Sequence, residues 1–378
     1  MIQALLDATP AGQVCTLPGG TIDVLENTPI IVRRPVTIDG NGTTIQVVNT
    51  AGERSTVMPT VPLFNFAAVP DGSDVTVRDL TIVGPDCTTW PTSWAPNTAA
   101  LDWTQARTWN SSFTIDGVTV SGGYCYAVQR AGGGLFRIFN SNLTGFVGAF
   151  SFFESHGGWG DLTVRNTTLA AQPNQKHTSI GAYIHPHLNV TWERVAASGW
   201  RRYACYLNGT PQSAGHHTFV EVTATDCALI QTGSSSETTL IRCVEQGTPA
   251  NGGSFFKGPV VSIGSTWAAK GLIGLMGNNA VTRRFVQDTI RPNNTWLAAG
   301  NGSSGRVLLY GCTVELDSRD CLLSSNPTST VEVEVVSTTV TVAGPPVGYS
   351  INVTGGSIRF IDSDVFPNVR VVPPGVLA

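Results

Sequence analysis

A short strand–turn–strand unit that repeats along the chain constrains the fold more than any other feature. Each copy has alternating apolar residues, then a turn rich in Asn, Asp or Gly, and then a second short strand. The copies begin at Val36, Val75, Phe113, Phe136, Leu162, Val190, Thr218, Thr238, Val260, Arg306, Val331 and Ile351. Between Phe113 and Val260 successive copies start 20 to 28 residues apart, about one coil of a β-solenoid. We therefore predict an all-β chain that forms a single-stranded parallel β-helix.

Two other folds with short repeated elements fit the pattern less well. A β-sandwich also has short alternating strands, but it does not repeat one strand–turn–strand signature at a near-constant spacing. A leucine-rich solenoid has a regular Leu/Asn consensus and helical segments, and neither occurs in this sequence. The β-helix is the simpler interpretation.

The repeat also predicts how the chain is divided. We expect an N-terminal cap with the first strands in residues 1–35, the β-helix in residues 36–365 and a C-terminal tail in residues 366–378. The longer intervals near the N-terminus indicate inserted loops at 46–74 and 85–112. Ile2 to Ala8 has the pattern of a short amphipathic helix, whose Ile2, Leu5 and Leu6 would cover the strand edges of the first coil.

Composition argues against several classes of protein. Only 13% of the residues are charged, compared with about 25% in an average globular protein, and there are 41 glycines. The net charge is −4 and basic residues cluster only in pairs, so we expect no nucleic-acid partner. No run of about 18 apolar residues is present, so we expect no membrane insertion. The 8 cysteines include no C-x-x-C pair, and we expect reduced core cysteines and no cofactor.

The opening of the chain carries a family resemblance. The N-terminal amphipathic helix is followed by Pro18-Gly19-Gly20 and then by VTIDGNGTTI, from Val36 to Ile45. This order resembles the cap and first coils of the pectate-lyase-like superfamily of right-handed parallel β-helices. The resemblance implies a right-handed helix. It leaves the activity open, since the superfamily includes polysaccharide lyases, glycoside hydrolases, sugar epimerases and bacteriophage spikes that bind or cut host-surface glycans.

The first residues favour the bacteriophage branch of that superfamily. Residues 1–13 contain neither a basic stretch nor a long apolar core, so the sequence shows no secretion signal. A secreted bacterial enzyme normally carries one, whereas a tail protein is made in the host cytoplasm and reaches the exterior by lysis. We therefore interpret the chain as a virion protein of the phage tail, with an extracellular location as the alternative. The resemblance to phage spikes implies a homotrimer that contacts other tail proteins and a host-surface glycan.

The candidate site lies in a segment that holds all 6 histidines, between His156 and His217. Measured against the repeat, these histidines precede three successive strands, so we expect them to stack on one edge of the solenoid. Carboxylates, imidazoles and an arginine of this segment could catalyse glycan cleavage: Glu154, Glu193, Asp161, His185, His187 and Arg201. Its aromatic and polar side chains could bind the substrate: Trp159, Tyr183, Trp192, Trp200, Arg202, His156 and His216.

Two reactions and two non-catalytic roles are compatible with these residues. A hydrolase needs two carboxylates, for which Glu154 with either Glu193 or Asp161 is our pair. A lyase needs a base and a cation, which His185 or His187 and Arg201 or Arg202 could supply. The same residues could instead form hydrogen-bonded stacks between coils or between subunits. We assign no metal site, because H-x-H and H-H supply ligands without a fixed geometry.

Three other features have simpler interpretations. Four tryptophans in one insertion, Trp90, Trp94, Trp103 and Trp109, suggest a glycan-binding lip or a subunit interface, and the interface is favoured because monomers rarely expose so much apolar surface. Asp residues in the repeated turns, such as Asp79, bond their own backbone. The C-terminal third, from Gly305 on, is interpreted as scaffold and cap.

Three functions remain open on the sequence alone. The first is a phage tail spike or tail-fibre protein that binds, and could degrade, a host-surface polysaccharide. The second is a free polysaccharide lyase or glycoside hydrolase. The third is a structural virion protein without catalysis.

Overall fold

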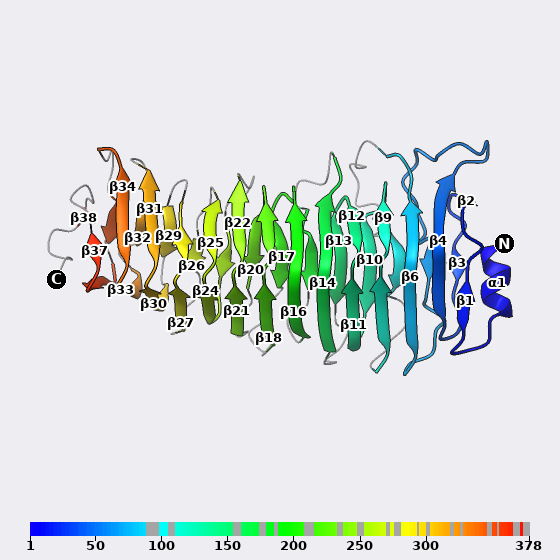
Figure 1. Cartoon of the computed structure of the whole chain (residues 1–378), viewed down its shortest axis with the longest axis horizontal. Coiled ribbons are helices and arrows are strands. Elements are labelled where there is room, and N and C mark those ends of the chain that lie inside the picture. Colours follow the sequence, from blue (N-terminus) through cyan, green and yellow to red (C-terminus); the bar gives the residue numbers. More distant parts are fainter. Residues whose placement is uncertain are drawn as a thin grey trace. The chain divides into compact units, whose positions relative to one another are not determined.

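The computed structural model forms two compact units, Met1–Ser198 and Gly199–Ala378, which are described separately (Figure 1). The description covers all residues except 88–97, 105–109, 154–159, 174–178, 185–187, 208–214, 233–236, 248–252, 270–272, 276–280, 293–294, 300–302, 318–320, 326–327, 346–349, 354, 366–370 and 373–378. No helix in the described part of the chain has the length and apolarity needed to cross a bilayer.

The first unit begins with one helix, α1 (Ile2–Ala8), and continues as two parallel sheets. The strands of its longer sheet are β1 (Val14–Thr16), β2 (Thr21–Leu25), β4 (Thr37–Val48), β6 (Asp74–Val83), β8 (Ser112–Asp116), β9 (Thr119–Ser121), β11 (Gly134–Phe139), β12 (Asn142–Gly145), β14 (Gly160–Ala171) and β16 (Leu188–Ser198). The strands of its second sheet are β3 (Ile30–Ile31), β5 (Phe64–Asn65), β7 (Ala99–Trp103), β10 (Tyr126–Ala131), β13 (Gly148–Phe153) and β15 (Ala182–Ile184).

The second unit has the same two kinds of sheet (Figure 1). The longer sheet contains β18 (His216–Val220), β19 (Thr223–Thr225), β21 (Glu237–Ile241), β22 (Val244–Gly247), β24 (Val260–Ile263), β25 (Thr266–Ala269), β27 (Thr282–Val286), β28 (Thr289–Ile290), β30 (Ser304–Tyr310), β31 (Thr313–Asp317), β33 (Thr330–Val336), β34 (Thr339–Ala343), β36 (Ser357–Ile361) and β37 (Asp364–Val365). The second contains β17 (Tyr203–Leu207), β20 (Ala228–Gln231), β23 (Phe255–Phe256), β26 (Ile273–Leu275), β29 (Thr295–Ala299), β32 (Cys321–Ser325), β35 (Ile351–Val353) and β38 (Val371–Val372).

Most coils therefore supply two consecutive strands to the longer sheet, or one long strand that occupies both positions, as in β4, β6, β14 and β16, and one strand to the second sheet. Equivalent strands of successive coils pair in parallel, as in Phe136 opposite Leu162. This arrangement confirms the predicted right-handed parallel β-helix with a short N-terminal helix. The segments interpreted as inserted loops contain β5 and β7, so part of each insertion belongs to the second sheet.

The two consecutive strands of a coil, or the two halves of a long strand, meet at a corner residue with positive φ. Several corners hold the residue types that adopt this conformation most readily, such as Asp79 (φ 50°), Asn140 (φ 49°) and Asn166 (φ 50°). This location agrees with the structural role predicted for Asp79. Arg194 (φ 52°) and Arg242 (φ 50°) adopt the same conformation at a backbone cost that is of order 1–2 kcal/mol.

A ladder of small polar side chains lies just inside these corners. The hydroxyl of Ser141 donates to Phe139 O and accepts from Val118 N, and Thr338 makes the equivalent bonds to Val336 O and Cys312 N. Cys243 and Cys312 occupy the same position, and their thiols donate to Ile241 O and Tyr310 O. The sulfhydryl thus replaces a hydroxyl in the ladder.

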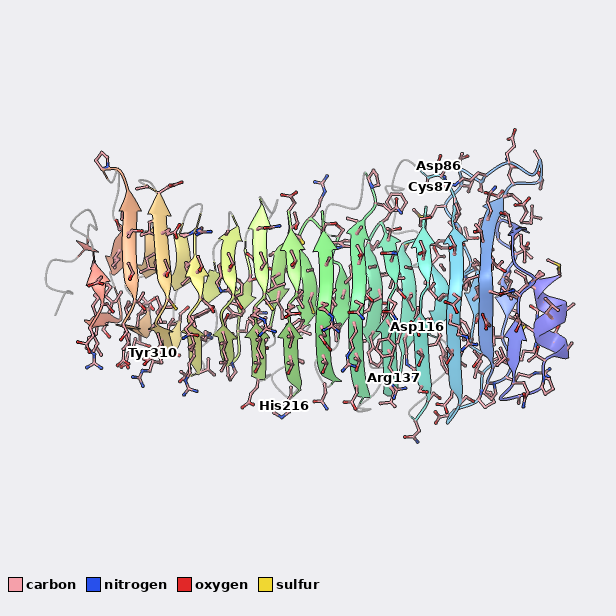
Figure 2. The ribbon with its side chains drawn as sticks, viewed as in Figure 1. Asp86, Cys87, Asp116, Arg137, His216 and Tyr310 are labelled. Carbon is pink, nitrogen blue, oxygen red and sulfur yellow. The ribbon has the colours of Figure 1, made fainter. Side chains whose placement is uncertain are left out.

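The cysteines whose side chains the structure describes fit the predicted reduced state. Six thiols are free and buried, those of Cys15, Cys125, Cys205, Cys227, Cys243 and Cys312. Cys87 is free and only partly buried, on the loop after β6 (Figure 2). Burial raises the pKa of Cys87 to about 11, so its thiol is protonated at neutral pH.

Inward-facing aromatic rings form the core of the first unit. The Phe113 ring lies 5.3 Å from Trp103 and 5.7 Å from Phe136, measured between centroids. Trp103 is fully buried, and the Arg130 guanidinium lies 4.6 Å above its ring. The expectation that Trp103 belongs to an exposed lip or a subunit interface is therefore wrong. The other three tryptophans of that insertion, Trp90, Trp94 and Trp109, lie outside the described residues.

Helix α1 covers the first strands as predicted from its amphipathic pattern. Ile2 and Leu6 are buried, whereas Leu5 is only partly buried. The Gln3 amide makes two hydrogen bonds to Ile31 in β3, accepting from its N–H at 2.8 Å and donating to its C=O at 3.0 Å. A side chain of the helix thus pairs with an edge of the second sheet that would otherwise be open.

Replacing Gln3 with Ala is expected to lower the free energy of unfolding by about 1–3 kcal/mol, because both polar groups of Ile31 lose their partner. Gln13→Ala, at an exposed glutamine in the loop before β1, serves as the control and should change stability by less than about 0.5 kcal/mol. Urea unfolding of the two variants measures the difference. Equal midpoints would show that Gln3 does not stabilise the cap.

Candidate functional site

Much of the segment that the sequence singles out lies outside the described residues. This applies to Glu154, His156, Trp159, His185 and His187. The carboxylate pairs that include Glu154 and the lyase base at His185 or His187 therefore stay predictions.

The structure corrects the roles of two tryptophans. Trp192 in β16 and Trp200, just before β17, are both 0% exposed. Trp192 follows Val190 by two residues in an alternating strand and therefore points into the core, where its ring lies 6.0 Å from Phe150. Neither indole presents a face to solvent, so the prediction that these two residues bind substrate is wrong.

Asp161 and Glu193 lie on the outer surface of the first unit. Asp161 pairs with Asn189 in the strand register, and Arg165 pairs with Glu193. The two acidic residues are thus four positions apart along the strand and one strand apart, or roughly 14 Å between their Cα atoms. Asp161 is held by Asn189 and Glu193 by Arg165, so the two carboxylates are bound by different partners and are not arranged as a catalytic pair.

Both carboxylates of the first unit have polar neighbours. Asn189 donates to Asp161 at 2.9 Å. Arg165 contacts Glu193 at 3.0 Å, and Arg194 forms a second ion pair with the same carboxylate. Tyr183 in β15 is partly buried. This arrangement fits the hydrogen-bonded stack between coils that the sequence left open.

In the second unit, neighbouring residues of the segment face different sides of a strand. His216 is exposed and its Nδ1 lies 3.4 Å from Glu237, whereas His217 is 1% exposed and points inward (Figure 2). The expectation that all histidines line one edge is therefore wrong for His217. Arg202 is exposed and Arg201 is partly buried. The roles of His216, Arg201 and Arg202 in binding or catalysis stay predictions.

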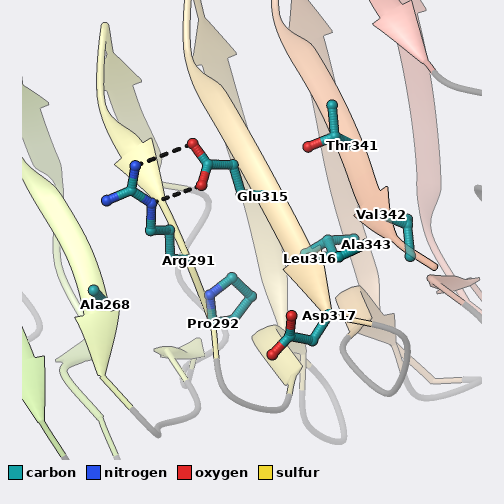
Figure 3. Close-up of a pocket in the computed structure, with 9 residues that line it drawn as sticks. All are labelled: Ala268, Arg291, Pro292, Glu315, Leu316, Asp317, Thr341, Val342 and Ala343. Carbon is teal, nitrogen blue, oxygen red and sulfur yellow. Dashed lines mark hydrogen bonds and ion pairs between the residues drawn. The ribbon is translucent and has the colours of Figure 1, made fainter.

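A surface groove in the second unit gives a second candidate site, which the sequence did not indicate. Its volume is about 530 Å³, within the range of small-molecule sites. Four successive coils line it, through residues of strands β25, β31 and β34 and through the two residues that follow β28 (Figure 3). The lining residues are Ala268, Arg291, Pro292, Glu315, Leu316, Asp317, Thr341, Val342 and Ala343.

Arg291 and Glu315 form a bidentate ion pair at the groove. Arg291 Nε and one terminal nitrogen donate to the two Glu315 oxygens at 2.8 and 3.1 Å (Figure 3). The backbone N–H of Arg291 donates to Trp267 O at 2.7 Å, which anchors the main chain of Arg291 to the preceding coil. The hydrogen bonds from Arg291 lower the pKa of Glu315, so this carboxylate is ionised at neutral pH.

The arrangement suits binding better than acid catalysis. Glu315 and Asp317 lie two residues apart on the outer face of β31, with roughly 7 Å between their Cα atoms. The two carboxyl groups of an inverting glycosidase lie roughly 6.5–9.5 Å apart, which is a similar separation. Glu315 cannot be the proton donor because it is held ionised by Arg291. Asp317 is exposed, whereas a general acid needs an apolar environment. The groove instead offers guanidinium donors and carboxylate and hydroxyl acceptors.

Among the described residues, no group of three or more His, Cys, Asp or Glu side chains could hold a metal ion.

A second depression, of about 330 Å³, lies near the start of β27, β30 and β33, where Thr282, Arg306 and Glu332 line it.

Comparisons with known proteins give a likeness in architecture only. No protein-family model matches the chain. No curated protein matches it in sequence. A structure of the Streptococcus pneumoniae surface protein and adhesin PfbA is 11% identical, with 95% of this chain and 94% of that chain covered and a TM-score of 0.47. A crystal structure of PfbA, described as a surface adhesin of Streptococcus pneumoniae, is 9% identical, with 96% and 87% covered and a TM-score of 0.43.

Proposed function

We propose that this chain binds an extended polysaccharide on a cell surface, and that it does so as a homotrimeric tail spike or tail-fibre protein of a bacteriophage. The groove across β25, β28, β31 and β34 is the observation that carries the binding role. It follows the direction in which the coils stack, so successive sugars of a chain would meet equivalent positions of successive coils. The cap and first coils resemble the pectate-lyase-like superfamily, which includes phage spikes, and this supports the tail location.

The charges of the groove favour a particular class of glycan. The groove is lined by one guanidinium, on Arg291, and by two carboxylates, on Glu315 and Asp317. An acidic sugar would add a further negative charge beside Asp317, which like-charge repulsion disfavours. Vicinal hydroxyls can instead accept from Arg291 and donate to Asp317. We therefore propose a neutral or amino-sugar polysaccharide as the ligand.

Arg291→Ala is expected to weaken glycan binding roughly tenfold to hundredfold, the loss that one or two charged hydrogen bonds imply. Arg78→Ala is the control, because Arg78 forms a surface ion pair with Asp39 in the first unit, away from the groove. Binding would be measured by biolayer interferometry on immobilised neutral and acidic capsular or cell-wall polysaccharides. Equal losses in both variants, or a preference for acidic polysaccharides, would contradict the proposed groove.

The two alternatives predict different behaviour in the same samples. A free lyase or hydrolase would release unsaturated or reducing ends, and Glu315→Gln or Asp317→Asn would change the yield if the groove were the active site. A structural virion protein would bind none of the polysaccharides at any concentration tested. Saturable binding without product formation supports the proposed role.

A further inference from the structure

A continuous row of apolar side chains crosses the outer surface of the second unit. Its members are the outward residues that immediately precede the positive-φ corners of successive coils. This apolar row consists of Val220, Ile241, Ile263, Val286, Tyr310, Val336 and Ile361. Each is paired with the next in the parallel register, so the side chains form one line along the direction of stacking.

The row is open to solvent and long. Ile263 is 38% and Tyr310 is 50% exposed, and the other five members are partly exposed (Figure 2). Seven positions at the spacing of neighbouring strands extend roughly 29 Å. Soluble monomers rarely expose contiguous apolar surface of this kind unless another molecule covers it.

The first unit shows that the position itself does not require apolar residues. The residues that precede its corners include Arg78, Asp116, Arg165 and Glu193. Arg165 pairs with Glu193 at 3.0 Å and Arg78 with Asp39 at 2.7 Å, and Asp116 accepts from the Asn140 amide at 2.8 Å. The sheet is thus compatible with a charged outer row, and the second unit carries an apolar one instead.

Charged side chains border the apolar row on both sides. On the corner side, Glu221 and Arg242 form an ion pair at 2.6 Å. On the other side, Glu334 is held between Arg306 and Arg359. An apolar centre with a polar rim is the usual anatomy of a protein interface. Because both rims carry both signs of charge, the surface can be complementary to a copy of itself.

We propose that the apolar row is the surface through which copies of this chain associate. Side chains in the row repeat at the strand spacing over seven coils, and a partner must share that spacing to interdigitate along the whole length. A second copy of the same chain has the same spacing of side chains.

This inference deepens the homotrimer of the proposed function, on which it rests, and it is independent of glycan binding. The test is the mass of the full chain in solution, measured by light scattering over a concentration series. Wild type is expected at a multiple of 39.9 kDa, and the double variant Ile263→Glu/Tyr310→Glu at 39.9 kDa with an unchanged circular dichroism spectrum. Phe139→Glu, at the equivalent position of the first unit, is the control and should remain associated.

Cross-linking keeps the test decisive if the double variant fails to fold. Tyr310→Cys places a thiol on the row without adding charge, and a short bis-maleimide is expected to link two copies at this position but not at Phe139→Cys. A wild-type mass of 39.9 kDa at the highest concentration would overturn the inference, as would equal cross-linking at both positions. Polysaccharide binding is measured on the same samples. A variant that stays associated but no longer binds polysaccharide would bear on the groove and not on the apolar row.

Discussion

Phe136→Ala is expected to lower the free energy of unfolding by about 3–5 kcal/mol, the cost of removing a fully buried phenyl ring. The ring contacts aromatic side chains of its own coil and of the preceding one, with centroid distances of 5.7 Å to Phe113 and 5.3 Å to Phe152. Close-packed rings from successive coils cannot collapse into the vacated space without moving the strands that carry them, so the cavity would remain.

The control for this variant lies on the same strand. Phe139 is three residues from Phe136 in β11, but it faces outward and is only partly buried. Phe139→Ala should therefore lower stability by about 1 kcal/mol or less, since little apolar surface is returned to water. Denaturant unfolding followed by circular dichroism measures both. Similar losses at the two positions would show that the core does not depend on the inward aromatic stack.

This pair also shows which part of the fold the sequence predicts well. Alternation along a strand decides whether a side chain points inward, because successive Cβ atoms face opposite sides of a sheet. Phe113 and Phe136 were placed at the start of repeats and are fully buried. The same rule places Trp192 inward, two residues after Val190. Composition alone suggested a sugar-binding aromatic residue there, and the register overrides that interpretation.

The groove was missed because one coil departs from the repeat. β27 contains Arg283 at an inward position, where the pattern calls for an apolar residue, and the repeat was therefore not recognised between Val260 and Arg306. Arg283 is 1% exposed, and its guanidinium donates to Lys257 O at 2.9 Å. Burial lowers its pKa to about 10, which still leaves it charged at neutral pH. Arg291 belongs to this coil, so its position beside Glu315 could not be predicted.

The outer surface is harder to predict than the core for a general reason. An outward residue contacts neighbours that are one coil away in sequence, so its environment depends on the exact length of every intervening loop. His216 and His217 illustrate this, because a shift of one residue exchanges the exposed and the buried imidazole. The corner residues are intermediate. Asn and Asp mark several of them, but Arg194 and Arg242 adopt the same conformation without any such signal.

A buried acid in the second unit provides the other large expected effect. Glu245 in β22 is 3% exposed, and its carboxylate accepts hydrogen bonds from Leu229 N at 2.7 Å and from the Ser254 hydroxyl. Burial raises the pKa of Glu245 in spite of these bonds. Since the folded chain binds this proton more tightly than the unfolded chain, the stabilising contribution is complete below the ordinary pKa of 4.5 and is lost as pH rises through the raised value.

Glu245→Gln is expected to remove this pH dependence. Glutamine stays neutral, its carbonyl oxygen can accept from Leu229 N and Ser254 Oγ, and only the long 3.4 Å bond from Ser254 N is lost. The variant should therefore gain stability relative to wild type as pH rises from 4.5, by at most about 1.4 kcal/mol per pH unit within the titration range. The difference between the two unfolding free energies isolates this group from carboxylates such as Glu315 and Glu334, whose lowered pKa values act in the opposite direction.

The control is Glu332→Gln, at an exposed position of β33. Urea unfolding of wild type and both variants at pH 4, 5, 6, 7 and 8 gives the comparison. We expect the Glu245 difference to increase with pH while the Glu332 difference stays within about 0.5 kcal/mol. Parallel stability curves for wild type and Glu245→Gln would mean that water or a backbone shift solvates the carboxylate.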